Sequence, residues 1–351
     1  MSAVLALVLP GAAAFVCLLF AALVFEQFRL RRRAFQVLWA LGLLWYGIGA
    51  GTEFVGAAFG WSEPIYRLWY LFGAILTAAY LGAGTVTLLA RTGFGYIAAL
   101  GLIVGGLFAL LSQQRLVREG TPADSAAVYG TLMLAVAAGE VLIYVTLRHR
   151  HLVGHVTIGI LAAATFVAAW MALTAPVAPP GYALDPYHVP VGSAFDPNVR
   201  VLTGPFNIAG ALCLVGGAIY SAYVYMPKRK ILRARRLPPI AAQVYGFATV
   251  LVNLVASIPS AWGAARAGAV HSRVPATLLI AVGGFIPSIT SGLNRFGLTW
   301  GFFLGELLGV LFIFAGFLVS EEVFRDRRVS LGSLVLWRGS GSLGAPSAPR
   351  H

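Results

Sequence analysis

Ten apolar segments, separated by short polar turns, occupy most of the chain. A helix needs about 20 residues to cross a hydrocarbon layer of ~30 Å, whereas β-barrel spans would read as short alternating segments. The pattern therefore predicts an all-α, polytopic transmembrane helix bundle of about ten (nine or ten) membrane-spanning helices within residues 1–320. The segments are residues 3–25, 34–60, 65–90, 95–112, 127–147, 155–174, 205–226, 239–262, 274–292 and 298–319.

Composition supports a membrane environment. Hydrophobic residues make up 59% of the chain and charged residues 11%, whereas soluble domains carry about 25% charged residues. The formal charge of +13 would suit nucleic acid. However, the basic residues lie at the ends of apolar runs, where the positive-inside rule and anionic headgroups explain them. The expected partner is thus a lipid bilayer and not nucleic acid.

Basic residues also predict an orientation. No basic residue precedes the first segment, and four arginines follow it, so it reads as a retained helix with its N-terminus outside the cell and not as a cleaved signal peptide. Arginine outnumbers lysine 23 to 2, and Ala and Gly are abundant, which indicates a GC-rich prokaryotic genome and hence the cell (plasma or inner) membrane. The turns expected in the cytoplasm are residues 26–33, Arg91, 148–155 and 228–236.

The C-terminal region leaves two topologies open. Ten spans would leave Arg325, Arg327 and Arg328 outside, unless nearby carboxylates offset them. Nine spans would follow if segment 274–292, which contains Pro275, Pro287 and a Gly-Gly pair, is broken or re-entrant. We favour ten spans, because this segment is long enough to cross. Residues 321–351, charged and then rich in Gly, Ser and Pro, are expected to form a disordered tail.

Three carboxylates lie inside apolar segments, where each needs a partner, a proton or water. Glu53 shares a helix face with Gly49, Gly56 and Gly60, so it is expected to point into the bundle. Arg67 follows across a short turn, which predicts a structural Glu53–Arg67 ion pair.

Glu140 and Glu306 form the second hypothesis. With ten spans they lie at one depth in the inner half of the membrane, where two carboxylates could share a proton or coordinate a cation. With nine spans Glu306 instead lies level with Glu53 in the outer half. Glu140 also has Tyr144 one turn later, so a shared proton without any function remains open.

Two segments carry polar stripes at helical spacing. Each stripe either lines a cavity or forms a tight interhelical seam, and for the first of them the seam is favoured because small and hydroxyl residues are usual at such interfaces. The candidate ligand-binding residues taken from these stripes are Thr77, Tyr80, Thr249 and Asn253, together with Glu140 and Glu306. The stripes are Tyr66, Tyr70, Gly73, Thr77, Tyr80, Gly84, Thr87 and, in segment 239–262, Tyr245, Thr249, Asn253, Ser257, Ser260.

The chemistry excludes several classes of protein. The two lysines lie in a loop, so no span offers one to a retinal Schiff base, and no nucleophile with a base can be named. His149, His151 and His155 lie among arginines that repel cations, so we expect no metal and no cofactor. The leading hypothesis is a small-molecule or ion binding or transport protein. The alternative is a membrane sensor or a scaffold subunit, in a homo-oligomer or a membrane complex, and a membrane enzyme ranks third.

The orientation is testable in cells. A cysteine introduced at Arg233, in the densest basic loop, should resist an impermeant thiol reagent applied from outside, because the positive-inside rule places it in the cytoplasm. Ready labelling would reverse the orientation of the whole chain.

Overall fold

A computed structural model describes residues 3–177, 182–184, 190–233, 239–267, 270–294, 299–320, 329–331 and 334–337. These group into two compact units, considered separately below. Unit 1 contains Met1–Ala218 and Ala281–Ile313, and unit 2 contains Ile219–Ile280 and Phe314–His351.

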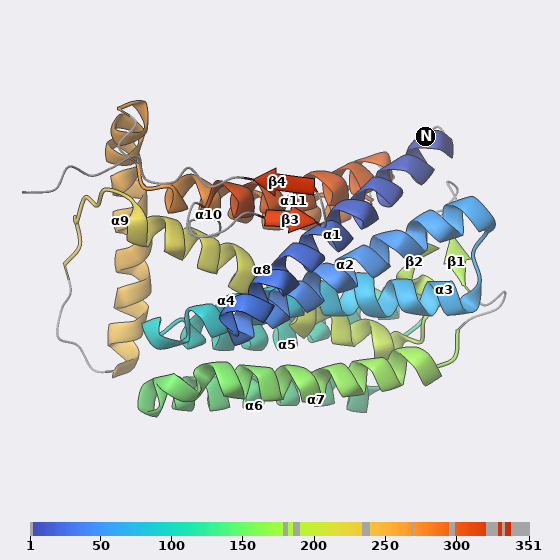
Figure 1. The fold of residues 1–351 in the computed structure, drawn as a ribbon. Helices are drawn as coiled ribbons and strands as arrows, with labels where there is room; N and C mark the ends of the chain where they lie inside the picture. Colours follow the sequence, from blue (N-terminus) through green and yellow to red (C-terminus); the bar gives the residue numbers. More distant parts are fainter. Residues whose placement is uncertain are drawn as a thin grey trace, which may run out of the picture. The chain divides into compact units, whose positions relative to one another are not determined.

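The chain is almost entirely helical (Figure 1), with two antiparallel pairs of short strands, β1 with β2 and β3 with β4. The helices are α1 (Ala3–Arg31), α2 (Ala34–Phe59), α3 (Glu63–Leu68), the π-helix η1 (Trp69–Leu76), α4 (Thr77–Leu88), α5 (Gly95–Arg118), α6 (Ser125–Arg148), α7 (Val153–Thr174), α8 (Pro197–Tyr225), α9 (Pro239–Arg266), α10 (Arg273–Asn294) and α11 (Thr299–Val319). The 3-10 turns are η2 (Ala90–Thr92), η3 (Arg150–Leu152) and η4 (Gly192–Ala194), and the strands are β1 (Ala183–Leu184), β2 (Pro190–Val191), β3 (Val329–Leu331) and β4 (Leu334–Trp337).

The predicted helical membrane fold is confirmed. Over the described ranges, nine helical segments are long and apolar enough to cross a membrane, and an apolar stretch of α9, Ala248–Ala264, is shorter. The protein is therefore a multi-pass membrane protein. Apolar runs predict most helix boundaries closely, as with residues 34–60 for α2. However, α1 and α5 end at Arg31 and Arg118, beyond their predicted ends at 25 and 112, and α8 begins at Pro197, before its predicted start at 205. The division at residue 320 stays a prediction, since residues 321–328 and 338–351 lie outside the described residues.

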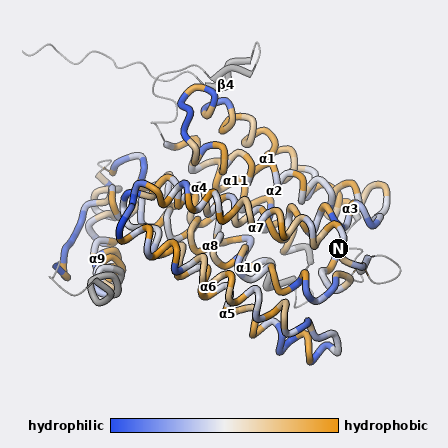
Figure 2. The backbone as a smooth tube through the Cα atoms, turned by 90° about the horizontal axis from the view of Figure 1, so that it is seen from below, coloured by the Kyte–Doolittle hydropathy of each residue, from blue (hydrophilic) through white to orange (hydrophobic). Residues whose placement is uncertain are grey.

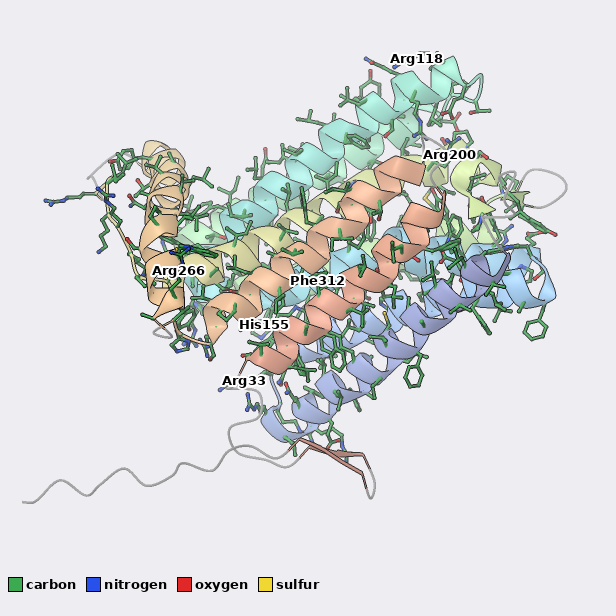
Figure 3. The ribbon with its side chains drawn as sticks, turned by 90° about the horizontal axis from the view of Figure 1, so that it is seen from above. Arg33, Arg118, His155, Arg200, Arg266 and Phe312 are labelled. Atoms are coloured by element: carbon green, nitrogen blue, oxygen red, sulfur yellow. The ribbon has the colours of Figure 1, made fainter. Side chains whose placement is uncertain are left out.

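Unit 1 carries most of its charged side chains at the two ends of its helices. Figure 2 shows hydrophobic residues along the helices and hydrophilic residues at the turns. The turns η2 and η3 contact each other, and Figure 3 shows Arg33 and His155 at this end, with Arg118 and Arg200 at the other. We call the first the basic end. At the opposite end, Glu119 forms ion pairs of 3.0 Å with both Arg115 and Arg200.

The third span contains a π-helical segment, which the sequence does not predict. It comprises α3, η1 and α4, and Thr77 closes η1 by donating its backbone N–H and its hydroxyl to the Phe72 carbonyl. Within η1, Gly73 meets Gly49 of α2 so closely that a Cβ on Gly49 would lie 2.8 Å from the Gly73 Cα. Small residues allow two backbones to approach in this way. We call this contact the glycine seam.

Segment 274–292 is not broken, in agreement with the prediction from its length, and the alternative drawn from its prolines, a broken or re-entrant helix, is not formed. The segment forms the continuous helix α10. Pro275 lies in the first turn, where a missing N–H costs nothing. Pro287 packs against Gly309, whose added Cβ would lie 2.7 Å from the proline Cγ. Gly309 of α11, which has no side chain, therefore accommodates the proline.

Two glycines of α2 give a matched test of the seam. Gly49→Ala should destabilise the protein by about 1–3 kcal/mol, because its Cβ would overlap the Gly73 backbone. Gly51→Ala should be neutral or stabilising by up to about 1 kcal/mol, because its Cβ would meet Ala14 at an ordinary 3.9 Å and alanine favours helices. Unfolding in mixed detergent micelles measures both, and equal effects would contradict the seam.

Candidate functional site

Glu53 is buried inside unit 1, as its small-residue helix face predicted, with 2% of its surface exposed. Its partner is the indole of Trp69, whose Nε1 donates a hydrogen bond of 2.8 Å to the Glu53 Oε1. Glu53 lies one turn beyond Gly49 on α2, and Trp69 lies one turn before Gly73 on the facing segment. Because the two segments run antiparallel across the glycine seam, the seam brings the indole over the carboxyl group.

Glu306 of α11 reaches the same place. Leu307 packs on a cluster of Ala13, Ala14 and Ala50, which seats this part of α11 against α1 and α2. The Tyr46 hydroxyl donates a hydrogen bond of 2.9 Å to the Glu306 backbone carbonyl. The side chains of Glu306 and Glu53 then lie close enough to interact with each other. We call these two residues the carboxyl pair.

The carboxyl pair lacks one donor. The Oε2 atoms of Glu53 and Glu306 are both buried and have no hydrogen-bond partner among the described residues. Ionised carboxylates only accept hydrogen bonds, and two like charges in a medium of low dielectric repel each other strongly. A single proton on one carboxyl group would supply the missing donor and remove one charge. A small cation between them would neutralise the pair by another route.

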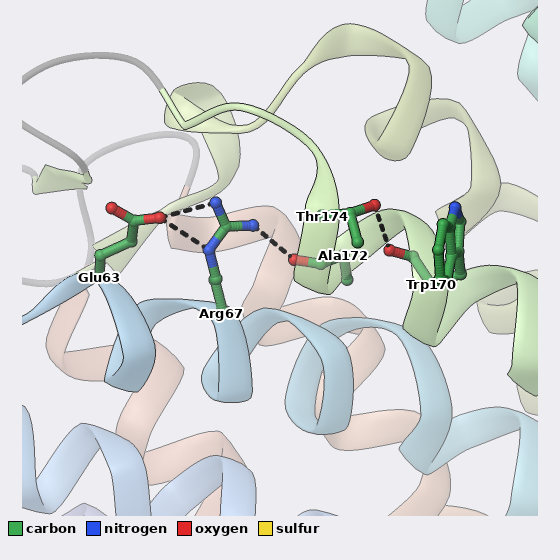
Figure 4. Close-up of polar contacts among 5 residues, drawn as sticks. All are labelled: Glu63, Arg67, Trp170, Ala172 and Thr174. Atoms are coloured by element: carbon green, nitrogen blue, oxygen red, sulfur yellow. Dashed lines mark hydrogen bonds and ion pairs between the residues drawn. The ribbon is translucent and has the colours of Figure 1, made fainter.

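Arg67 does not pair with Glu53. Its guanidinium lies 2.6 Å from the Glu63 carboxylate, one turn earlier on the same helix, and donates a hydrogen bond of 2.8 Å to the Ala172 carbonyl of α7 (Figure 4). A cation at the end of a helix satisfies a carbonyl that has no partner within the helix. Arg67 thus joins α3 to the end of α7, and the expected Glu53–Arg67 pair is replaced by these contacts.

The structure does not bring Glu140 to Glu306. Glu140 lies on the exposed face of α6, and Tyr144, one turn later, is also exposed. Helix α6 packs mainly on α5 and also on α7. The inner-half carboxylate site expected for ten spans is therefore not formed, and Glu306 joins Glu53, as the nine-span alternative anticipated.

The stripe on the third span forms a seam. The Tyr80 hydroxyl lies 3.3 Å from the Thr165 hydroxyl of α7, and the Thr77 hydroxyl donates a hydrogen bond to a carbonyl of its own span. Tyr66 donates to the Val191 carbonyl, and Gly84 lies against Trp39. Neither Thr77 nor Tyr80 lines the apolar cavity of about 100 Å³ nearby, which is bordered by residues such as Ala79, Ala83, Leu161 and Cys213.

In unit 2, the polar stripe of α9 binds the chain's own backbone. Asn253 accepts hydrogen bonds from the N–H groups of Ile231 and Leu232 and donates to the Leu232 carbonyl. The Thr249 hydroxyl is buried and has no partner in the described part of the chain. Asn253 therefore has a structural role.

Sequence reasoning missed Tyr46 and Trp69. A signal for Trp69 existed, because an indole N–H inside a membrane span needs an acceptor, and Glu53 is the nearest carboxylate on the preceding span. A tyrosine donating to a backbone carbonyl some 260 positions away leaves no such local signal. No protein-family model, no curated protein and no solved structure matches this chain.

The contact between Trp69 and Glu53 can be tested by removing the indole N–H. Trp69→Phe should destabilise the protein by about 1–2 kcal/mol, because the buried Glu53 carboxyl group loses its hydrogen-bond donor. Trp170→Phe, at an exposed position of α7, should change stability by less than about 0.5 kcal/mol. Chemical unfolding in mixed micelles compares the two, and a harmless Trp69→Phe would contradict the assigned contact.

Proposed function

We propose that this membrane protein binds a proton at the carboxyl pair and moves it between the two sides of the membrane. The observation that carries the proposal is the proximity of Glu53 and Glu306, two glutamates on separate spanning helices whose Oε2 atoms are buried without a hydrogen-bond partner among the described residues. Ionisable groups inside spans are costly, and they commonly mark proton relays and ion pathways.

The surroundings favour a proton over a metal cation. A hard cation such as Ca²⁺ takes six to eight oxygen ligands, whereas the groups around the pair are the Trp69 indole, a hydrogen-bond donor, and the Tyr46 hydroxyl, which is already donating. One proton shared by two carboxyl groups needs no further ligand. Sodium, which carries one charge and is also bound by carboxylates, is the cation that the experiment must distinguish.

The adjacent π-helix supplies a place for movement. Single π-helical turns often occur at functional sites, and η1 begins at Trp69, the residue that holds Glu53. A change of η1 to a regular α-helix would rotate Trp69 relative to the glycine seam and release Glu53. The same proposal places the protein in a prokaryotic cell membrane with the basic end in the cytoplasm, supported by the arginines gathered there.

Proton movement can be measured in proteoliposomes that contain a trapped pH-sensitive dye and carry a potassium diffusion potential. The unmodified protein should acidify the lumen when the potential is negative inside. Glu53→Gln and Glu306→Gln should each slow acidification at least about tenfold, because glutamine donates a hydrogen bond but does not release a proton. Glu140→Gln, a carboxylate removed from an exposed face of a span, should keep the rate.

Three outcomes would refute the proposal. Acidification that is equal in all variants would separate proton movement from the carboxyl pair. A sodium gradient that drives flux in the absence of proton movement would assign the site to the cation. The absence of any flux, with a protonated carboxyl band in the infrared spectrum that disappears in Glu306→Gln, would leave the pair as a structural element of a sensor or scaffold.

A further inference from the structure

The end of α8 and the start of α10 lie next to each other. Tyr225 ends α8 and Arg273 begins α10, and the Arg273 guanidinium donates a hydrogen bond to the Tyr225 hydroxyl and lies 4.5 Å from the ring centroid. His271 lies beside the same ring, at 5.0 Å between centroids. Residues 226–272, which include α9, therefore begin and end together, so α9 cannot be a single crossing flanked by loops on opposite sides.

A basic segment lies along α9. We call residues 226–233 the basic strap. The backbone N–H of Arg229 donates a hydrogen bond of 2.8 Å to the Ser257 hydroxyl, and the Tyr245 hydroxyl donates one of 2.9 Å to the Arg233 carbonyl. Between them, Asn253 binds the backbone of Leu232, as described above. From Ser257 back to Tyr245 is twelve helical residues, or about 18 Å. The strap therefore runs antiparallel to α9 over more than three turns.

This arrangement argues against a hairpin that penetrates the hydrocarbon. The strap is not helical, and it carries Lys228, Arg229, Lys230 and Arg233, all exposed. Non-helical backbone is not tolerated in contact with lipid, because its polar groups have no partners there, and buried charges add a further penalty.

Full exposure of α9 to water is also unfavourable, because one face of the helix is apolar. Its exposed stripe consists of Leu251, Val255, Ile258 and Trp262, at spacings of four, three and four residues, with Leu251 43% and Trp262 61% exposed. Asn253 and Ser257, which hold the strap, are buried on the opposite side. A helix with one apolar and one polar face suits the boundary between headgroups and acyl chains.

The positive charge of this region indicates that the lipid headgroups it binds are anionic. Residues 219–280 contain eight lysines and arginines and no aspartate or glutamate. The region therefore has no carboxylate of its own to neutralise the strap. Anionic headgroups attract such clusters, and the attraction acts within about a Debye length of ~10 Å.

We propose that α9 is an interfacial helix, with its apolar stripe in the acyl layer and the basic strap bound to anionic phospholipid headgroups. The chain then has nine spans, because α8 and α10 meet at the same face without a crossing between them. Gly316, near the end of α11, packs against Ala276 near the start of α10, so the end of α11 lies at that face too. This inference is independent of the carboxyl pair.

Depth measurements test the orientation of α9. In the full-length protein with Cys17→Ala and Cys213→Ala, single cysteines at Leu251 and Trp262 are labelled with an environment-sensitive fluorophore and quenched by lipids spin-labelled at known depths. An interfacial helix gives nearly equal depths. A spanning helix separates positions eleven residues apart by about 16 Å. Met133 and Tyr144 of α6, also eleven residues apart and exposed, provide the spanning control.

A second measurement tests the lipid. With the fluorophore at Val255, quenching by headgroup-labelled phosphatidylglycerol should exceed quenching by the matching phosphatidylcholine at least about threefold in vesicles containing both. Combined replacement of Lys228, Arg229, Lys230 and Arg233 by Gln should bring the ratio near one. Combined replacement of Arg29, Arg31, Arg32 and Arg33 by Gln, an equal loss of charge at the turn after α1, should leave it unchanged.

Each remaining outcome overturns the proposal. Depths at 251 and 262 that differ as in the α6 control would make α9 a span. Equal depths without preference for phosphatidylglycerol would exclude anionic lipid as the ligand of the strap. A fluorophore at Val255 that no lipid quenches would indicate another occupant, and cross-linking between copies through this cysteine would identify it as a second copy of the chain.

Discussion

The structure depends on one constraint, which is that hydrocarbon offers no partner to a polar group. Backbone groups meet it by forming helices. Side chains meet it by bonding to other helices or to their own, as Trp69 does to Glu53 and as Thr157 does to the Val153 carbonyl one turn earlier. The carboxyl pair is one place in unit 1 where the constraint is met incompletely, since the Oε2 atoms of Glu53 and Glu306 are buried and have no hydrogen-bond partner among the described residues. In the function that we propose, a proton on one carboxyl group supplies the missing hydrogen-bond donor.

The glycine seam and the carboxyl pair are one arrangement. Without side chains at Gly49 and Gly73, α2 and η1 come close enough for residues one turn away to meet. The indole then replaces water as the donor to Glu53. Packing between spans in lipid has little hydrophobic driving force, so close backbone contact and hydrogen bonds supply it. A change in η1 would disturb packing and hydrogen bonding together, which is how a small local rearrangement could alter the protonation of a buried site.

Sequence reasoning identified the carboxylates but misassigned their partners. Glu53 was expected to meet Arg67 because a short turn joins their helices, yet Glu63 lies on the same helix face as Arg67 and is nearer. Glu140 and Glu306 were placed at one depth by counting residues, but depth does not specify the direction in which a side chain points, and Glu140 points outward. Asn253 needed a buried partner, as expected for an amide in an apolar helix, and that partner is the backbone of a loop.

The sequence by itself determined the helical membrane fold, most helix ends to within a few residues, and the inward direction of Glu53, because these follow from local hydropathy and from helical periodicity. Only the tertiary structure decided that Glu306 joins Glu53, that η1 is a π-helix, and that the strap lies along α9. Each of these depends on contacts between residues far apart in the chain, such as Tyr46 with Glu306 or Tyr225 with Arg273. Hydropathy records how apolar a position is, and it carries no information about which helix lies opposite.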